Sequence, residues 1–328
     1  MNNELILIVE DDPTLASGLK ETLEALGYQA ATAGNGQEAL LSLDQVRPNL
    51  ILSDIGMPVM DGYQFFDAVR ARPEWTTIPF LFLTARARRT DMLVAKGLGA
   101  DDYITKPWTA EELLVAVSSK LKRAQEVALA QLRKAYKESL TVLANAIEAR
   151  DSYTRGHIER VSQYALAMGR EMGWGPQRLE DLEYGAILHD IGKIAVPELI
   201  LAKPDRLTMA EFAEIRKHPI FGVRMLKDIA HVAIAIPAVR HHHERFDGSG
   251  YPDGLAGEEI PPEARIVAVA DSFDAITTDR VYRSARPFEE ALAEIIRGSG
   301  EQFDPEVVKS FQRVWQAGQT LLSSPDLR

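Results

Sequence analysis

Five of the seven histidines in this chain occur together with aspartates in a pattern that could hold metal ions. They form one adjacent His-Asp pair, one adjacent His-His pair and three single positions: His189-Asp190, His242-His243, His157, His218 and Asp271. Imidazole and carboxylate groups together are ligands for Zn, Fe, Mn or Ni ions that activate water. One histidine alone is more often a structural residue, but two adjacent pairs in one segment favour a metal site.

A second set of polar residues follows short apolar runs in the first 120 residues. Its members are Glu10, Asp11 and Asp12 after LILIV (5–9), Asp54 after LILS (50–53), Thr84 after PFLFL (79–83) and Lys106 after YIT (103–105). Clustered carboxylates repel one another unless a divalent cation neutralises them, and oxygen ligands suit Mg²⁺. A carboxylate beside Mg²⁺ can accept a phosphoryl group whose oxygens Lys106 and Thr84 stabilise. Each acid alone could be a helix cap or a loop residue, whereas the ordered set predicts a phosphoryl site.

The apolar runs alternate with amphipathic stretches, which predicts how these residues are positioned. Runs that are apolar on both faces are typical of buried parallel strands. Pro13 opens the first helix and Gly27 closes it, and Gly97 and Gly99 end a later one. Alternating strands and helices predict a doubly wound α/β sheet with its site at the carboxyl ends of the strands.

Residues 1–120 resemble a bacterial response-regulator receiver domain of the CheY-like, flavodoxin-like fold. The matching motifs are VED (9–11), SDIGMPVMDG (53–62), LTA (83–85) and DDYITKP (101–107). The resemblance implies that Asp54 accepts a phosphoryl group from a sensor histidine kinase. It also implies a Mg²⁺ ion and a phosphoryl switch, with the Mg²⁺ held by Glu10, Asp11, Asp54 and a carbonyl near Gly56, and the switch formed by Thr84, Tyr103 and Lys106. Asp12 is expected to be a helix N-cap.

The stretch from Glu111 to Arg150 contains neither proline nor glycine and predicts helix. One apolar stripe runs along it at steps of three or four residues: Leu129, Leu132, Tyr136, Leu140, Leu143 and Ile147. Two readings remain open. Two ordinary helices could pack on their own domains, or one continuous helix, with residues 121–140 as connector, could pair with a second copy in a homodimer and carry a signal.

Beyond residue 140 the apolar periodicity is helical, which predicts an all-α domain over residues 141–328. His157 shares a stripe with Val161, Tyr164 and Met168. His189 shares one with Leu179, Leu182 and Ala186, in a helix opened by Pro176 and ended near Gly192. A histidine that faces inward must find a partner, because burying an unpaired imidazole is costly. Asp190 and Asp271 could be such partners or could themselves bind metal.

The run HHERFDGSGYPDGLAG (242–257) is polar and rich in glycine between helical segments. Because a histidine pair flanks it, we interpret it as a wall of the site, where small residues let the backbone approach a ligand. Lys193, Arg280 and Arg283 would be surface charges by default, and near a metal centre they indicate an anionic substrate. His231 and His241 receive no role.

Residues 140–320 resemble the HD-GYP phosphodiesterases, a subgroup of the HD superfamily that acts on cyclic dinucleotides. The matching motifs are YTRGHIERV (153–161), LHDIGK (188–193), KHPIFG (217–222), HHERFDGSGYP (242–252), ADSFDAITTDRVYR (270–283) and FDPEVV (303–308). The resemblance implies that the five histidines, Asp190 and Asp271 are the metal ligands and that Asp190 bridges the ions. It further implies a catalytic role for Asp190 and Lys193, and a set of substrate contacts made of Lys193, Gly250, Tyr251, Pro252, Arg280 and Arg283.

The chain departs from this family at two points. Some members carry a glutamate one helical turn before the first histidine that helps to hold a third ion, and Tyr153 stands there in this chain. We therefore expect two metal ions rather than three. The second departure is Val281 between Arg280 and Tyr282, where the family usually has proline, and we expect a small effect from it.

These features together predict a response regulator that hydrolyses cyclic di-GMP to pGpG, with a second cut to GMP left open, under control of Asp54 phosphorylation. A non-enzymatic cyclic-dinucleotide receptor and a hydrolase of another nucleotide, such as cyclic GMP-AMP or guanosine tetraphosphate, remain alternatives. A formal net charge of −11 and the absence of a basic recognition helix argue against binding DNA. We also expect a cytoplasmic protein without a membrane segment, because no apolar run is long enough and the acidic start does not resemble a signal peptide. The sequence has no cysteine, so any transition metal must bind to N and O ligands.

Overall fold

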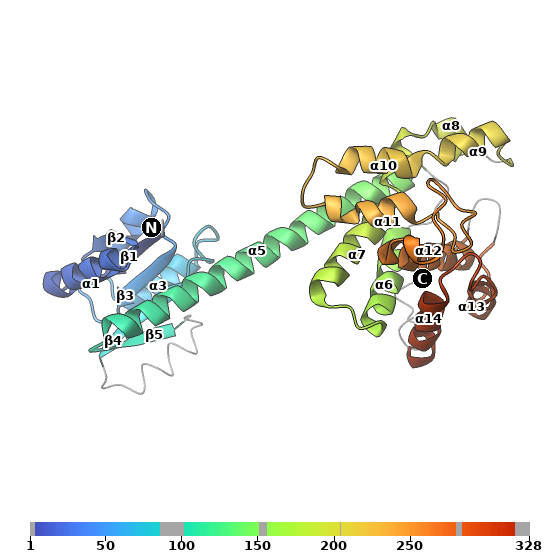
Figure 1. Ribbon diagram of the computed structural model, residues 1–328. Helices are drawn as coiled ribbons and strands as arrows, with labels where there is room; N and C mark the ends of the chain where they lie inside the picture. Colours follow the sequence, from blue (N-terminus) through green and yellow to red (C-terminus); the bar gives the residue numbers. More distant parts are fainter. Residues whose placement is uncertain (1–3, 86–101, 151–155, 204, 280–283, 319–328) are drawn as a thin grey trace. The chain divides into compact units, whose positions relative to one another are not determined.

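The computed structural model describes residues 4–85, 102–150, 156–203, 205–279 and 284–318 (Figure 1). The chain divides into two compact units, Met1–Arg133 and Lys134–Arg328, and each is considered by itself below. Among the described residues, every helix is too short or too polar to cross a bilayer.

The first unit is a parallel five-stranded sheet with helices on both faces. Its strands are β1 (Leu5–Val9), β2 (Gln29–Ala33), β3 (Leu50–Asp54), β4 (Phe80–Ala85) and β5 (Asp102–Lys106), in the order β2-β1-β3-β4-β5. The helices between them in the described residues are α1 (Pro13–Ala25), α2 (Gly36–Leu43) and α3 (Gly62–Arg70). This architecture confirms the predicted doubly wound α/β fold.

Alternating side chains of the central strands build a separate core on each face of the sheet. On one face, Leu7 and Ile51 pack with Phe65 and Phe66 of α3. On the other face, Ile6 packs with residues from α1 and from the start of α5 (Ala110–Glu148). Burial on both faces explains why these strands are apolar throughout.

The strand β2 has no counterpart among the apolar runs recognised in the sequence. Of its residues QAATA only Ala33 is buried, because β2 lies at the edge of the sheet and pairs only with β1. The helix end predicted at Gly97 and Gly99 lies outside the described residues.

The predicted connector is one continuous helix, α5, rather than two separate helices. Its Leu113, Val117 and Leu121 are buried in the core of the first unit. Its Ala144 and Ile147 are buried in a core of the second unit, and Leu140 packs against them. The predicted stripe is thus partly a packing face, while Leu129, Leu132 and Leu143 of the same stripe remain exposed.

The second unit is helical throughout its described residues, which confirms the predicted all-α class. After the end of α5 it contains α6 (His157–Glu171), α7 (Pro176–Leu188), η1 (Ile191–Ala195), α8 (Glu198–Leu201), α9 (Met209–Ile215), α10 (His218–Leu226), η2 (Ala233–Ala235), α11 (Ile236–His241), η3 (Gly257–Glu259), α12 (Pro262–Thr277), α13 (Phe288–Arg297) and α14 (Pro305–Ala317). Its largest core is formed by α6, α7, α12, α13 and α14 around Phe273 and Phe311.

The helix α7 ends earlier than the sequence suggested. We predicted an end near Gly192, but α7 stops at Leu188, and His189 caps it. The chain then tightens into the 3₁₀ turn η1, where Lys193 N–H donates to the Asp190 carbonyl. This turn brings the Asp190 and Lys193 side chains to the same place.

Candidate metal centre

The predicted metal ligands come from several helices of the second unit, and most of them stand at helix ends. His157 is the first residue of α6, His218 is the first residue of α10, and His189 caps the end of α7. His242 and His243 follow the last residue of α11, and Asp271 lies on α12. Four of these residues, His157, His189, His218 and His242, are fully or almost fully buried.

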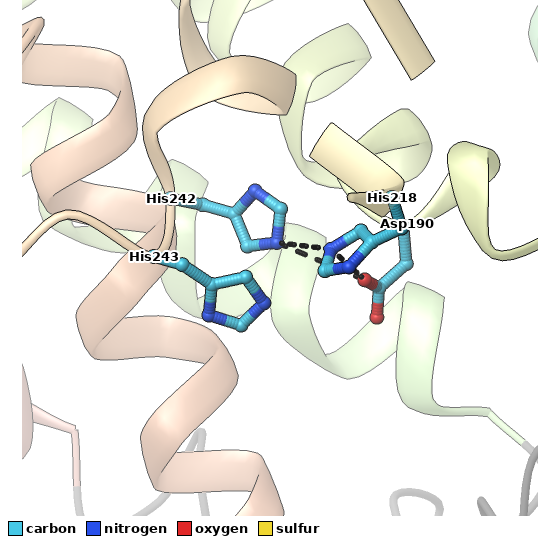
Figure 2. Close-up of side chains that lie close together, drawn as sticks. All are labelled: Asp190, His218, His242 and His243. Carbon is cyan, nitrogen blue, oxygen red and sulfur yellow. Dashed lines mark hydrogen bonds and ion pairs between the residues drawn. The ribbon is translucent and has the colours of Figure 1, made fainter. Parts of the chain in front are cut away.

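One group of ligand atoms gathers around the carboxylate of Asp190. Asp190 Oδ1 lies 3.1 Å from His218 Nε2 and 3.7 Å from His242 Nε2, and these two nitrogens are 3.4 Å apart (Figure 2). The ring of His243 lies beside that of His242, with the centroids 4.1 Å apart. Asp190, His218, His242 and His243 each offer a ligand atom within 4.8 Å of the others.

Gly192 allows this approach between η1 and α10. A Cβ atom at Gly192 would lie only 1.9 Å from the carbonyl oxygen of His218. Such an approach is open only to glycine, so the residue is needed for close backbone packing here. That packing holds Asp190, on one side of the contact, near His218 on the other.

A second group of ligand atoms gathers at the other side of Asp190. It consists of Glu148, His157, His189 and Asp190, again with one ligand atom each within 4.8 Å of the others. Glu148 Oε1 lies 3.3 Å and Asp271 Oδ1 lies 3.5 Å from His157 Nε2. Asp190 is therefore common to both groups.

The histidines are held so that the same nitrogen of each faces the centre. His189 Nδ1 lies 2.8 Å from the Ala186 carbonyl, His218 Nδ1 lies 2.8 Å from the Ile215 carbonyl, and His242 Nδ1 lies 3.1 Å from the Val239 carbonyl. A carbonyl oxygen can only accept, so each Nδ1 carries the proton. When the ring is neutral, each Nε2 therefore offers its lone pair to a cation, which is the usual arrangement of metal-binding histidines.

His157 follows the same rule with a carboxylate as its partner. Its Nδ1 donates to Asp274 Oδ2 over 2.6 Å, and Asp274 is itself fully buried and paired with Arg160. A histidine held by a carboxylate is a more basic ligand. Asp274 was not among the sequence predictions, although its position three residues after Asp271 on one helix was a usable signal.

Burial and neighbouring charges shift the pKa values of several side chains at the centre. Burial raises the pKa of Glu148 to about 7, against the opposing effect of His157. Burial acts to lower the pKa of His189, but the Asp190 carboxylate outweighs it and raises that pKa to about 9. Burial lowers the pKa of His242 and of His243, so both rings are neutral at pH 7.

The residues present fit divalent cations. Among the described residues, Glu148 Oε1, His189 Nε2 and Asp271 Oδ1 are buried without a hydrogen bond. Buried polar atoms normally have partners, and groups of this type without one indicate an ion at the site. Neutral imidazoles with carboxylates, and no thiolate, form a donor set for Zn, Fe, Mn or Ni.

Lys193 lies at the edge of this centre. Its Nζ is 2.7 Å from Asp190 Oδ2, and the side chain is almost fully buried. The ammonium group thus pairs with the carboxylate that is common to both groups of ligand atoms.

The loop that contains Gly250, Tyr251 and Pro252 packs directly on the histidines. The Tyr251 ring stacks on His243 with centroids 4.8 Å apart, and the Arg216 guanidinium lies over the Tyr251 ring. A Cβ atom at Gly250 would lie 2.3 Å from the Arg245 nitrogen, so only glycine fits there. The Tyr251-Pro252 peptide is cis.

A buried carboxylate that the sequence analysis missed fixes the end of this loop. Glu244 Oε1 accepts hydrogen bonds from the backbone N–H groups of Asp253 and Gly254, over 2.7 and 3.1 Å. His241, which received no role, pairs with Asp253. His231 packs its ring against Tyr136. Arg280, Arg283 and Tyr153 lie outside the described residues.

Glu148 is the other site residue that sequence reasoning missed. It is the last residue of α5, it is buried, and it stands nine positions before His157. No local motif links Glu148 with the histidine cluster, so only the fold reveals it.

The predicted phosphoryl site in the first unit also assembles. Glu10, Asp11 and Asp54 offer ligand atoms within 4.8 Å of one another. Lys106 Nζ lies 2.7 Å from Glu10 Oε2 and 3.2 Å from Asp54 Oδ2. Burial raises the pKa of Glu10, against the effect of Lys106. The acids can therefore share a Mg²⁺ ion beside a lysine.

The other predicted receiver residues lie on or next to β3, β4 and β5. Thr84 is buried near the end of β4, Tyr103 packs against a core of the sheet, and Gly56 is exposed just after β3. Asp12 caps α1, as predicted, by accepting from the Thr14 and Leu15 N–H groups.

Comparison with known proteins gives both units a family. A model of the response regulator receiver domain matches residues 6–118, and a model of the HD domain matches residues 141–307. Cyclic di-GMP phosphodiesterase response regulator RpfG of Xanthomonas campestris pv. campestris is 34% identical over 94% of this chain and 87% of its own length.

Two further relatives show how the family varies. A cyclic di-GMP phosphodiesterase of Thermotoga maritima is 33% identical over 94% of this chain and 90% of its own length. The 3'3'-cGAMP-specific phosphodiesterase 2 of Vibrio cholerae is 37% identical over 57% of this chain and 36% of its own length. The chain therefore belongs to the response regulators that join a receiver domain to an HD domain.

Proposed function

We propose that the HD domain hydrolyses cyclic di-GMP to pGpG, with a second cut to GMP left open. The observation that carries this proposal is the convergence of inward-facing histidine Nε2 atoms on the shared carboxylate of Asp190. Relatives from Xanthomonas campestris and Thermotoga maritima that match over 94% of this chain bear the name of this activity.

Two divalent cations account for the two groups of ligand atoms. Asp190, His218, His242 and His243 would hold one ion, and His157, His189, Asp190 and Asp271 would hold the other, with Asp190 common to both sets. When bound, Fe, Mn, Ni or Zn ions in these sets supply a water that is deprotonated near neutral pH. Tyr153 stands where some family members have the glutamate that helps to hold a third ion, which supports a centre of two ions.

The protein groups around the centre then act on the phosphodiester. The Lys193 ammonium stabilises charge that builds on the phosphoryl oxygens and can give a proton to the departing 3′ oxygen. Tyr251, stacked on His243, and the adjacent Gly250 and Pro252 form a wall against which the substrate binds. Arg280 and Arg283 are proposed phosphate and guanine contacts.

A second candidate substrate is cyclic GMP-AMP, which one relative of the HD domain is named for. A non-enzymatic receptor is the third candidate, and the complete ligand set disfavours it. The test is a product assay with cyclic di-GMP, cyclic GMP-AMP and guanosine tetraphosphate after anaerobic loading with Mn²⁺ or Fe²⁺. Hydrolysis of cyclic di-GMP as the preferred substrate supports the proposal. If none of the three nucleotides is hydrolysed, the proposal is wrong.

Regulation is proposed to start at Asp54 in the receiver domain (residues 1–120). A sensor histidine kinase phosphorylates Asp54 beside the Mg²⁺ held by Glu10, Asp11 and the carbonyl near Gly56. The added charge biases a two-state domain through Thr84, Tyr103 and Lys106. The connector (121–140) passes the change to the HD domain (141–328).

A homodimer is part of this proposal. Leu129, Leu132 and Leu143 on α5 expose about half or more of their surface, at a spacing suited to a helix pair. Sedimentation of the full chain tests it, with a dimer as the expected species and a monomer at all concentrations as the contrary result.

A further inference from the structure

Glu148, at the end of α5, lies at the metal centre. It is the last residue of α5, only 5% of its surface is exposed, and its Oε1 lies 3.3 Å from His157 Nε2. That oxygen makes no hydrogen bond among the described residues. A buried carboxylate oxygen without a hydrogen bond is costly, and a cation is the partner that would satisfy it.

The packing around Glu148 holds it in this position. Ala144 and Ile147, the preceding inward residues of α5, are buried against Ile158, Ile187 and Leu188. Ile158 directly follows His157, and Ile187 and Leu188 are the two residues before His189. The end of α5 thus packs against the elements that present the two histidines but belongs to a different helix, so a displacement of α5 along this contact would move the carboxylate relative to them.

The other end of the same helix belongs to the receiver core. Leu113, Val117 and Leu121 of α5 pack with Ile8, Leu52 and Leu83 of the central strands. Glu10, Asp54 and Thr84 stand within two residues of these strand positions in the sequence. One uninterrupted helix thus has buried contacts next to the phosphoryl site and a carboxylate at the metal centre.

We propose that Glu148 is a ligand of the cation held by His157 and His189. Because Glu148 ends α5, the metal affinity of the HD domain then depends on the state of the receiver. The proposal rests on the proposed function only in taking the centre to bind metal. The glutamate that some family members use stands one turn before the first histidine, at the position of Tyr153, whereas Glu148 stands nine positions before that histidine.

Such a link has a thermodynamic consequence that can be measured without substrate. If the phosphorylated receiver changes the metal affinity by some factor, metal binding must change the receiver equilibrium by the same factor. Loss of a group that orients or completes a metal site lowers affinity by about 10–100-fold. Removing Glu148 should therefore weaken the binding of one of the two cations. It should also abolish the dependence of that binding on the state of the receiver.

The experiment measures Mn²⁺ binding to the full chain without nucleotide, with excess Mg²⁺ filling the receiver site. Wild type, Glu148→Gln and Glu138→Gln are compared with and without beryllofluoride, which mimics the phosphoryl group on Asp54. Glu138 is the matched control, because it lies on the same helix with its side chain 65% exposed. If Glu148→Gln does not fold, Glu148→Asp, which shortens the carboxylate by one methylene, takes its place with the same outcomes.

We expect wild type and Glu138→Gln to bind two Mn²⁺ ions, one of which changes affinity with beryllofluoride. In Glu148→Gln, the affinity for one ion should fall by a factor of about ten or more, and neither affinity should change with beryllofluoride. If Glu148→Gln binds both ions as tightly as wild type does, Glu148 is not a ligand. A beryllofluoride response equal to that of wild type would overturn the coupling. Neither result bears on cyclic di-GMP hydrolysis, which the product assay tests separately.

Discussion

His157 Nδ1 donates a hydrogen bond to Asp274 Oδ2 over 2.6 Å, and this bond decides which nitrogen of His157 faces the metal centre. Asp274 is fully buried, and Arg160 binds both of its oxygens. The pKa of Asp274 is lowered even though burial opposes this, because His157 and Arg160 bond to it. The carboxylate is thus a fixed acceptor that orients a metal ligand.

Asp274→Asn should weaken metal binding by about 10–100-fold, because the amide no longer fixes the His157 ring and its basicity falls. The control is Asp304→Asn, since Asp304 is also buried, pairs with Arg265 and caps α14 away from the centre. Mn²⁺ titration should separate the two variants. Equal metal affinity in both would remove the orienting role of Asp274.

Gly192→Ala should lower the melting temperature and the metal content together. The added Cβ would meet the His218 carbonyl at 1.9 Å, so η1 must move away from α10 and Asp190 must leave His218. Gly175→Ala is the matched control, because a Cβ there meets nothing within 4 Å and φ is −72°. Thermal unfolding with metal analysis measures the effect. A Gly192→Ala protein with full metal content would show that this contact does not position the ligands.

Glu244→Ala should raise the KM for cyclic di-GMP while both cations stay bound. The change leaves the Asp253 and Gly254 N–H groups without their acceptor, at about 1–3 kcal/mol for each group that remains buried. The loop that carries Tyr251 should then loosen. Glu244→Gln keeps an acceptor oxygen and is the control. If the alanine variant loses metal instead, Glu244 supports the histidines rather than the loop.

Asp54→Asn should abolish phosphorylation by a small phosphodonor and with it any change in hydrolysis rate. The nearby Asp12→Asn is the control, because asparagine caps a helix as well as aspartate does and the α1 cap is kept. Intact-protein mass spectrometry and rate measurements with the phosphodonor test this prediction. The regulatory proposal fails if the hydrolysis rate of Asp54→Asn changes with the phosphodonor as that of wild type does.

The sequence predicted those parts of the fold whose signal is local. The runs LILIV and PFLFL identified central strands because burial on both faces makes a strand apolar along its whole length. The edge strand β2 was missed because QAATA is partly exposed and has no such run. The early end of α7 was missed because the turn after His189 depends on the contact of Gly192 with α10.

Some residues of the candidate site could be predicted from local sequence, and others could not. His189-Asp190 and His242-His243 are adjacent pairs, so their chemistry is visible before any fold is known. Glu148 and Glu244 are ordinary glutamates in the sequence, and only tertiary packing buries them beside histidines or backbone N–H groups. Helix periodicity placed His157 on an inward face, but it could not identify Asp274 as its partner.

The central claim is that two cations bind around Asp190 and make the HD domain a phosphodiesterase. The most direct test is metal analysis of anaerobically purified protein, coupled to cyclic di-GMP hydrolysis before and after chelation, with His218→Ala alongside. The account predicts two transition-metal ions per chain, loss of hydrolysis on chelation, recovery with Mn²⁺ or Fe²⁺, and a loss of metal in His218→Ala. Hydrolysis that survives complete metal removal, or a fully loaded protein that leaves cyclic di-GMP intact, would contradict it.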